Sequence, residues 1–182
     1  MQVQPLREIE DEEQLLDVKM ESKKFQALGH PFIQEIRESF TTSSNSHHLV
    51  KIDLGGPSLR EKIVARAHPD DNDETVSEVT FFTEQQVLKI WTMVVLALEH
   101  AHHLGVAHEG LFSESVIFSP DGDSLQVCDW VNRVYKTAKA VGGGHRMTFP
   151  QVDESPFERD VYSLGLILYE MVTLDRSRIQ PH

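Results

Sequence analysis

A long segment with one apolar face is the feature that most constrains how this chain can fold. Between Thr83 and Leu104, large apolar side chains recur every three or four residues, which predicts an amphipathic helix that Gly105 ends. A second segment, Val161–Val172, is apolar almost all round, which predicts a helix buried in a core. Two such helices need a packed helical layer, and 182 residues are enough to form it within one compact domain.

The remaining segments predict a mixture of short strands and helices. Runs of apolar and β-branched residues bounded by turn residues indicate strands at Val3–Ile9, Phe32–Phe40, His47–Leu54, Ser115–Phe118 and Ser124–Cys128. Apolar spacing indicates further helices at Glu10–Leu28 and Ser58–Ala67. Ser58 and Glu61 are placed to form a capping box at the start of the second of these helices. We expect loops at residues 68–74, which are acidic, and at residues 136–150, which contain three consecutive glycines.

The charge balance and the cysteine count narrow the classes of function. The chain has 29 acidic and 17 basic residues, a net charge of −12, so its surface repels phosphate backbones and we expect no nucleic-acid partner. No apolar run reaches the roughly 18 residues of a membrane span, so we expect no membrane insertion. Cys128 is the single cysteine and cannot form an internal disulfide, which favours the cytoplasm or another reducing intracellular compartment.

Several stretches, in the right order, resemble a protein kinase domain. LGVAHEGLFSESVIFSPDGDSLQVCDW resembles the segment that carries H-R-D-L-x-x-x-N, a hairpin and D-F-G. SPFERDVYSLGLILYEMVTL resembles the segment that forms the central C-lobe helix, while HPFIQEIRESF and LALEHAHHLGVAH are similar to NIMA-related serine/threonine kinases. The resemblance covers nearly the whole chain. It implies an α+β fold, with a reduced N-lobe of about three strands and one helix at residues 1–54, and a partial, mainly helical C-lobe at residues 55–182 that ends after the central buried helix.

On this resemblance, the positions that transfer a phosphoryl group are degenerate. His108 matches the histidine of H-R-D, but Glu109 stands at the arginine and Gly110 at the catalytic aspartate, so the general base is missing. Ser115 stands at the metal-binding asparagine. Asp129 matches the magnesium-binding aspartate of D-F-G and is retained. The resemblance therefore implies that most of the catalytic machinery has been lost.

The nucleotide-binding positions are also incomplete. No Gly-rich phosphate loop precedes the first strand; Arg7 stands at the strand lysine and Glu21 at its helix partner. These two residues either form an ion pair or are ordinary surface charges. Lys51 stands where the family has a large apolar residue beside the adenine pocket, so it makes that pocket less hospitable to a base. The resemblance leaves Arg7, Glu21 and Asp129 as a residual site for weakly bound ATP and magnesium.

The positions that hold the fold are better kept. The resemblance implies that Phe25, His108 and Trp130 stack between the lobes, and that Asp160 holds the backbone of the catalytic loop. We therefore favour the hypothesis of a catalytically inactive kinase-like domain, a pseudokinase, that binds another protein as a scaffold or regulatory module. One alternative is a weakly active ATP-dependent serine/threonine kinase that uses a relocated base and Arg7. The other is a kinase fragment without a function or a stable fold.

Overall fold

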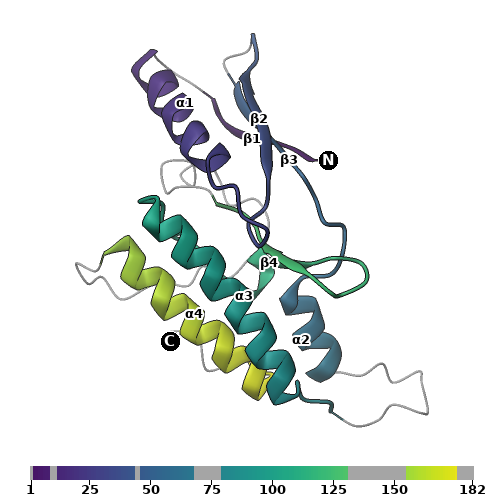
Figure 1. The fold of residues 1–182 in the computed structure, drawn as a ribbon. Coiled ribbons are helices and arrows are strands. Elements are labelled where there is room, and N and C mark those ends of the chain that lie inside the picture. Colours follow the sequence, from purple (N-terminus) through teal and green to yellow (C-terminus); the bar gives the residue numbers. More distant parts are fainter. Residues whose placement is uncertain (1, 9–11, 44–45, 68–78, 131–154, 176–182) are drawn as a thin grey trace.

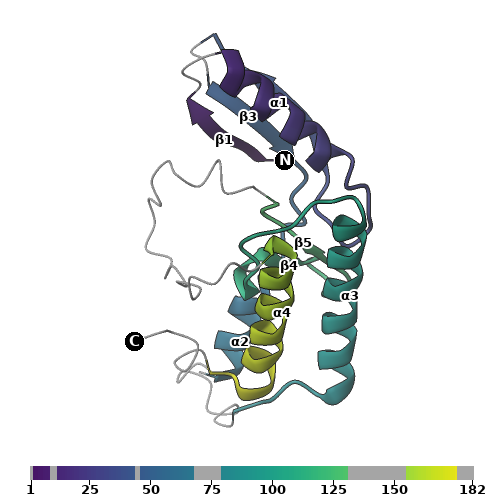
Figure 2. The same ribbon diagram turned by 90° about the vertical axis from the view of Figure 1, so that its left-hand side faces the viewer.

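The computed structural model describes residues 2–8, 12–43, 46–67, 79–130 and 155–175. Its first part is an antiparallel sheet of three strands in the order β1-β3-β2, with one helix packed beside it (Figures 1 and 2). The elements are β1 (Gln2–Glu8), α1 (Glu12–Gln26), β2 (Ile36–Thr41) and β3 (Ser46–Lys51). The three strands and one helix predicted for this part are therefore confirmed.

The second part is mainly helical. Its elements are α2 (Leu59–Ala67), α3 (Glu84–His103), a short 3-10 turn η1 (Ser113–Ser115), β4 (Val116–Phe118), β5 (Leu125–Val127) and α4 (Pro156–Thr173). The strands β4 and β5 form an antiparallel hairpin. Helices α3 and α4 lie side by side and run in opposite directions, and α2 packs against η1 and β4 (Figures 1 and 2). Together the two parts give the α+β fold predicted from the sequence.

Local hydrogen bonds explain where two of these helices begin. The predicted box before α2 is confirmed: the Ser58 N–H donates to Oε2 of Glu61 at 2.7 Å, and the Glu61 N–H donates to Oγ of Ser58 at 3.1 Å. The same device begins α3, where the Gln86 N–H donates to Oγ1 of Thr83 at 3.2 Å and the Thr83 N–H donates to Oε1 of Gln86 at 3.0 Å. Each box satisfies two N–H groups that have no partner inside the helix.

The segment just before β2 joins the sheet to the hairpin through backbone hydrogen bonds. Ile33 forms an isolated parallel bridge with Val127. The Val127 N–H donates to the Phe32 carbonyl at 2.8 Å, and the Gln34 N–H donates to the Val127 carbonyl at 2.9 Å. One buried apolar cluster runs through both parts and includes residues of α1, β3, α3, β5 and α4. These backbone contacts therefore hold the end of β3 close to the end of β5, where the site described below lies.

Three sequence predictions about elements need correction or remain open. The helix at Val161–Val172 is not buried all round: Val161, Tyr162 and Val172 are 61%, 54% and 56% exposed, because α3 covers one face and no other described helix packs on the opposite face. The strand predicted from Phe32 begins only at Ile36, since the preceding residues form the turn and the bridge to β5. The loops predicted at 68–74 and 136–150 lie outside the described residues.

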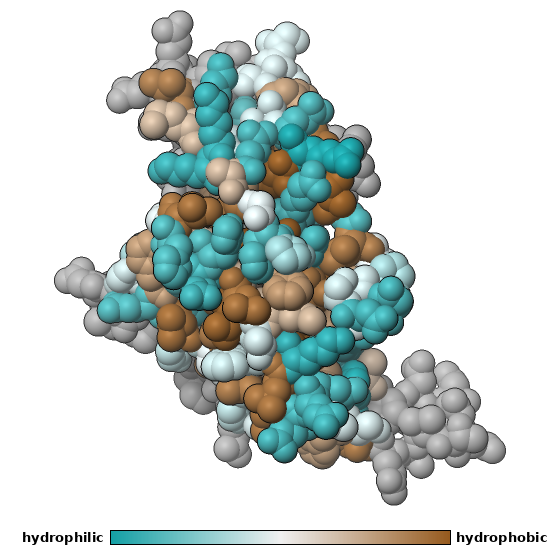
Figure 3. All heavy atoms as spheres, viewed as in Figure 1, coloured by the Kyte–Doolittle hydropathy of each residue, from teal (hydrophilic) through white to brown (hydrophobic). Residues whose placement is uncertain are grey.

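Apolar side chains also reach the surface elsewhere. Figure 3 shows hydrophobic patches, in brown, separated by hydrophilic side chains over the face that α3 and α4 present. Leu88, Leu96 and Leu104 contribute to the exposed apolar surface of α3 and its end. Within the described residues, no helix is both long enough and apolar enough to cross a bilayer.

Candidate functional site

A buried aspartate at the start of α4 holds the backbone at residues 108–109. Asp160 is 1% exposed. Its Oδ2 accepts the N–H of His108 at 2.7 Å, and its Oδ1 accepts the N–H of Glu109 at 2.9 Å. Nε2 of His102 lies 2.9 Å from the same Oδ2. Because Glu109 has a φ of 57°, in the left-handed region, these charge-assisted bonds hold a loop conformation that is unfavourable for a residue with a side chain.

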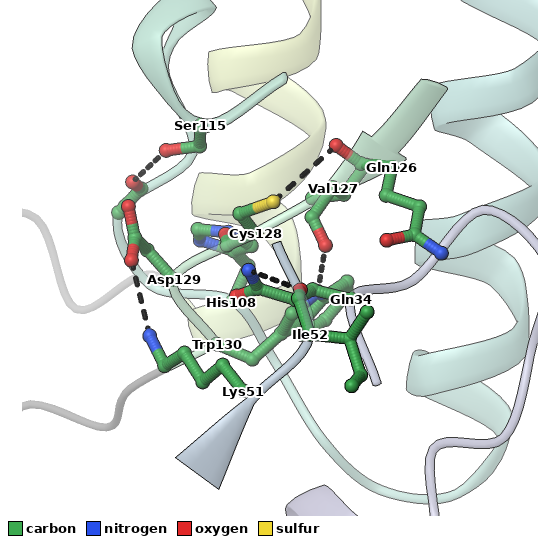
Figure 4. Close-up of polar contacts among 11 residues, drawn as sticks. Gln34, Lys51, Ile52, His108, Ser115, Gln126, Val127, Cys128, Asp129 and Trp130 are labelled. Carbon is green, nitrogen blue, oxygen red and sulfur yellow. Dashed lines mark hydrogen bonds and ion pairs between the residues drawn. The ribbon is translucent and has the colours of Figure 1, made fainter. Parts of the chain in front are cut away.

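The side chain of His108 packs between this loop and the end of β5. It is fully buried, its Nε2 lies 2.7 Å from the Cys128 carbonyl, and its ring centroid lies 4.8 Å from that of Trp130. The Trp130 indole N–H donates to the Val127 carbonyl at 2.8 Å. Trp130 and Phe25 belong to one buried cluster. The structure therefore places His108 against Trp130 (Figure 4) and buries Phe25 in the same apolar cluster as Trp130.

The two most degenerate positions face each other. Gly110 has no side chain, and the hydroxyl of Ser115 points at its carbonyl oxygen across 3.5 Å (Figure 4). Where the kinase resemblance places a carboxylate base and an amide ligand, the structure has a backbone carbonyl and a neutral hydroxyl. This pair offers neither the negative charge nor the basicity that a proton acceptor for a substrate hydroxyl requires.

Asp129 is paired with a lysine from the neighbouring sheet. Nζ of Lys51, at the end of β3, lies 3.2 Å from Oδ1 of Asp129 (Figure 4). The lysine side chain is 4% exposed, whereas the aspartate side chain is 63% exposed. An ammonium group buried to this degree needs a counter-charge, because desolvation of an isolated ion is costly. Asp129 supplies that counter-charge, so the carboxylate already has a cation of this chain.

The neighbouring carboxylate is paired in a similar way. Oε2 of Glu109 lies 3.5 Å from Nη2 of Arg159, and the two side chains are 13% and 19% exposed. Sequence reasoning missed Arg159, and it placed Lys51 without identifying Asp129 as its partner. Two features of the sequence could have identified the pair of Glu109 and Arg159. An acidic residue stands where the resemblance expects arginine, and an arginine directly precedes Asp160.

Cys128 is not a nucleophile in this site. Burial raises the pKa of its thiol to about 12, with a smaller contribution from the negative charge of Asp129. Since the thiolate is the reactive form, the thiol stays protonated at neutral pH. The buried thiol is therefore a poor nucleophile at neutral pH.

The kinase resemblance implies Mg²⁺ and ATP, and the residues present do not fit the metal. Asp129 is held by Lys51, Gly110 offers only backbone, and Ser115 turns its hydroxyl to a carbonyl. Within the described residues, no three His, Cys, Asp or Glu side chains gather as metal ligands. The side chains of Arg7 and Glu21, the other two predicted nucleotide-binding residues, lie outside the described part of the structure.

Comparisons with known proteins show the family to which the chain belongs. The chain matches the protein kinase domain model over residues 3–177. It is 30% identical to calcium-dependent protein kinase 22 of Arabidopsis thaliana over 93% of this chain and 34% of that protein. It is 26% identical to serine/threonine-protein kinase nekl-2 of Caenorhabditis elegans, over 88% of this chain and 45% of that protein.

A further relative and a solved structure belong to the same family. Serine/threonine-protein kinase Nek1 of Mus musculus is 26% identical over 81% of this chain and 12% of that protein. The chain thus spans less than half the length of these curated relatives. A crystal structure of the PknI kinase domain of Mycobacterium tuberculosis superposes with a TM-score of 0.67 at 18% identity, over 96% of this chain and 64% of that one. The chain belongs to the protein kinase family.

Proposed function

We propose that this chain is a catalytically inactive kinase domain that acts by binding another protein. The observation that carries the proposal is that both carboxylates beside the degenerate catalytic segment are paired with cations of this chain. Glu109 is paired with Arg159, and Asp129 is paired with Lys51. Neither carboxylate is therefore free to act as a base or as a magnesium ligand.

A Coulomb argument indicates which ion Asp129 prefers. Magnesium at Asp129 would place two positive charges beside the buried ammonium of Lys51, which is 4% exposed. Two unit charges about 4 Å apart repel by about 4 kcal/mol at an effective dielectric of about 20, and the divalent ion doubles that cost. Lysine is also fixed to the chain, so it competes without a loss of translational freedom. The buried ammonium of Lys51 therefore opposes the binding of a divalent ion at Asp129.

The proposed binding role follows from what the fold retains. The buried contacts of His108, Trp130 and Asp160 stabilise the loop and the core, although the chemistry near them is missing. A domain that keeps its shape without its catalytic groups can present a surface to a partner. We propose a protein partner, since the net charge of −12 disfavours nucleic acid.

A nucleotide titration and a phosphotransfer assay test the proposal. We expect millimolar Mg-ATP to leave the melting temperature of the 182-residue chain unchanged, because a ligand that binds the folded state would raise it. We expect no transfer of labelled phosphate to casein. Magnesium-dependent transfer that Asp129→Ala abolishes would overturn the proposal and support the alternative of a weakly active serine/threonine kinase. Failure of the purified chain to melt cooperatively would instead support the alternative of a fragment without a stable fold.

A further inference from the structure

A second site lies between α2, the first half of α3 and the turn of the β4–β5 hairpin. The structure has a pocket of about 180 Å³ there, and its lining contains none of the residues of the degenerate catalytic site. The lining residues come from α2, from the N-terminal half of α3 and from the hairpin, and Figure 1 shows where these elements lie. Sites for drug-sized ligands have volumes of roughly 300–1,000 Å³, so this pocket is the size for one or two side chains rather than a nucleotide.

The pocket is positively charged in a strongly acidic protein. Lys62, Arg66 and Lys89 line it, and Asp123 is its one acidic lining residue, so the lining carries three positive charges and one negative, a net charge of +2. Within the described residues, none of the three cations has a carboxylate within 4.0 Å. The overall charge of the chain is −12. A local excess of unpaired cations on such a surface attracts an anionic partner and orients its approach.

Aromatic rings hold two of these cations above an apolar base. Nζ of Lys62 lies 4.5 Å from the ring centroid of Phe118, and the guanidinium carbon of Arg66 lies 3.9 Å from that of Phe82. Both rings are at least nine-tenths buried. Cation–π contact fixes the position of a charged group but leaves its N–H donors available. The pocket therefore combines apolar walls for a hydrophobic side chain with positioned donors for carboxylates.

Arg66 retains unused hydrogen-bonding capacity. Its Nη1 donates to the Lys62 carbonyl at 3.1 Å, but its buried Nε has no partner in the described part of the chain. Burial lowers the pKa of this guanidinium from its usual value. A buried charged donor without an acceptor is unfavourable, and a carboxylate placed beside the guanidinium would relieve that cost.

We propose that this pocket binds an acidic peptide segment of a partner protein, with an apolar side chain inserted between carboxylates that meet Lys62, Arg66 and Lys89. This inference rests on the proposed function, because it names the surface through which the domain would bind. Charge complementarity selects an acidic partner, and the buried rings select one with an apolar anchor. Rim charges of this kind contribute specificity and association rate more than affinity, so binding should weaken as salt rises.

An NMR titration of the full chain tests the proposal. The probe is the peptide Glu-Glu-Leu-Asp-Glu-Leu-Glu, compared with Gln-Gln-Leu-Asn-Gln-Leu-Gln, which lacks charge, and Glu-Glu-Ser-Asp-Glu-Ser-Glu, which lacks the anchor. We expect the first peptide alone to shift the amide resonances of Gln86, Gly122 and Ser124, which line the pocket, in a saturable way. No saturable shift at millimolar peptide, or equal shifts with a control peptide, would overturn the proposal.

Charge variants show whether the pocket cations are responsible. The double change Lys62→Gln with Lys89→Gln should weaken binding by roughly twofold to thirtyfold, since each exposed charge pair contributes about 0.2–1 kcal/mol. Lys23→Gln with Lys24→Gln is the matched control, because it removes the same charge from the exposed face of α1 and should leave affinity unchanged. Equal weakening by both double variants would overturn the proposal, since it would show only a response to net charge.

Two further outcomes distinguish a partner peptide from an occupant supplied by this chain, and distinguish failure of this inference from failure of the proposed function. If binding appears only after Asp70, Asp71 and Asp73 are changed to asparagine, the acidic segment of this chain is the occupant, and the proposal of a partner peptide is overturned. Shifts at Gly110 and Asp129 with Mg-ATP would contradict the expected absence of nucleotide binding and would leave the peptide result unchanged. A negative peptide result with no Mg-ATP shifts would overturn this inference and leave the inactive domain standing.

Discussion

Nζ of Lys51 lies 3.2 Å from Oδ1 of Asp129, although the two residues are 78 positions apart in the chain. The lysine side chain is 4% exposed and the aspartate side chain is 63% exposed, so water reaches the two partners very unequally. The ammonium has lost its hydration and depends on the carboxylate, whereas the carboxylate can be hydrated without the lysine. Removing one partner should therefore have a different effect from removing the other.

We expect Asp129→Ala to destabilise the protein more than Lys51→Met. The first change leaves a buried ammonium unpaired and should lower the free energy of unfolding by about 2 kcal/mol, whereas the second removes the buried charge and should change it by less than about 1 kcal/mol. Urea unfolding followed by tryptophan fluorescence measures both values. Equal losses would show that the lysine is hydrated despite its small exposed fraction.

Asp160→Ala should be among the most destabilising changes. It leaves the buried N–H groups of His108 and Glu109 without their acceptor and removes the partner of His102, which should cost about 3 kcal/mol or more. Glu99→Ala is the matched control, because it also removes a carboxylate but at an exposed position of α3. Thermal unfolding compares the two variants; similar melting temperatures would contradict the role assigned to Asp160.

Stability should fall in acid partly because of His47. This side chain is 1% exposed; its Nε2 lies 2.9 Å from Oγ of Ser22 and its Nδ1 lies 3.0 Å from Oγ1 of Thr41. Burial, and then the positive charges of His48 and Lys19, lower its pKa from the ordinary 6.5. The unfolded chain therefore binds a proton at higher pH than the folded chain, and the stability contribution of neutral His47 is lost as pH falls below about 6.5.

His47→Gln tests this pH dependence, because glutamine keeps a donor and an acceptor but does not titrate. The difference in urea midpoint between about pH 7.5 and about pH 5.5 should be smaller in His47→Gln than in the unaltered protein, whatever the variant's absolute stability. An unchanged difference would assign the acid sensitivity to other groups.

Cys128 should be unreactive in the folded protein. Its thiol has a pKa raised to about 12, mainly by burial, so almost no thiolate is present at pH 8. We expect Ellman's reagent to modify the native chain far more slowly than the chain in urea, where the thiol is exposed. Modification at the same rate in both states would show that the thiol is accessible in the folded protein.

Gly56→Ala should disrupt the contact between the segment before α2 and the hairpin. A Cβ at this position would overlap the Phe118 carbonyl oxygen and lie 2.8 Å from that of Ser119. Backbone atoms cannot move aside easily, so the expected cost is about 2 kcal/mol, as for overpacked cores. Gly29→Ala is the control, because a Cβ there meets nothing within 4 Å. Equal urea midpoints for the two variants would contradict this close approach.

Elements with local signals could be predicted from the sequence. The helix expected at Thr83–Leu104 is observed as Glu84–His103, and Ser58 and Glu61 form the expected box, because both depend on residues only a few positions apart. The exposure of α4 could not be predicted in the same way. Apolar residues on every side of Val161–Val172 indicate what the helix would prefer to bury, but whether another element covers each face depends on the packing of the whole chain.

For the site, the sequence by itself determined which chemical groups are available. Gly110 and Ser115 lack a base and a strong metal ligand wherever they lie. Only the tertiary structure decided how the remaining charges are used: Lys51 meets Asp129, Glu109 meets Arg159, and Lys62, Arg66 and Lys89 line one pocket. The physical reason is distance along the chain. Sequence periodicity specifies a face of one element, whereas these contacts join different elements and arise from their packing and from the directions of their side chains.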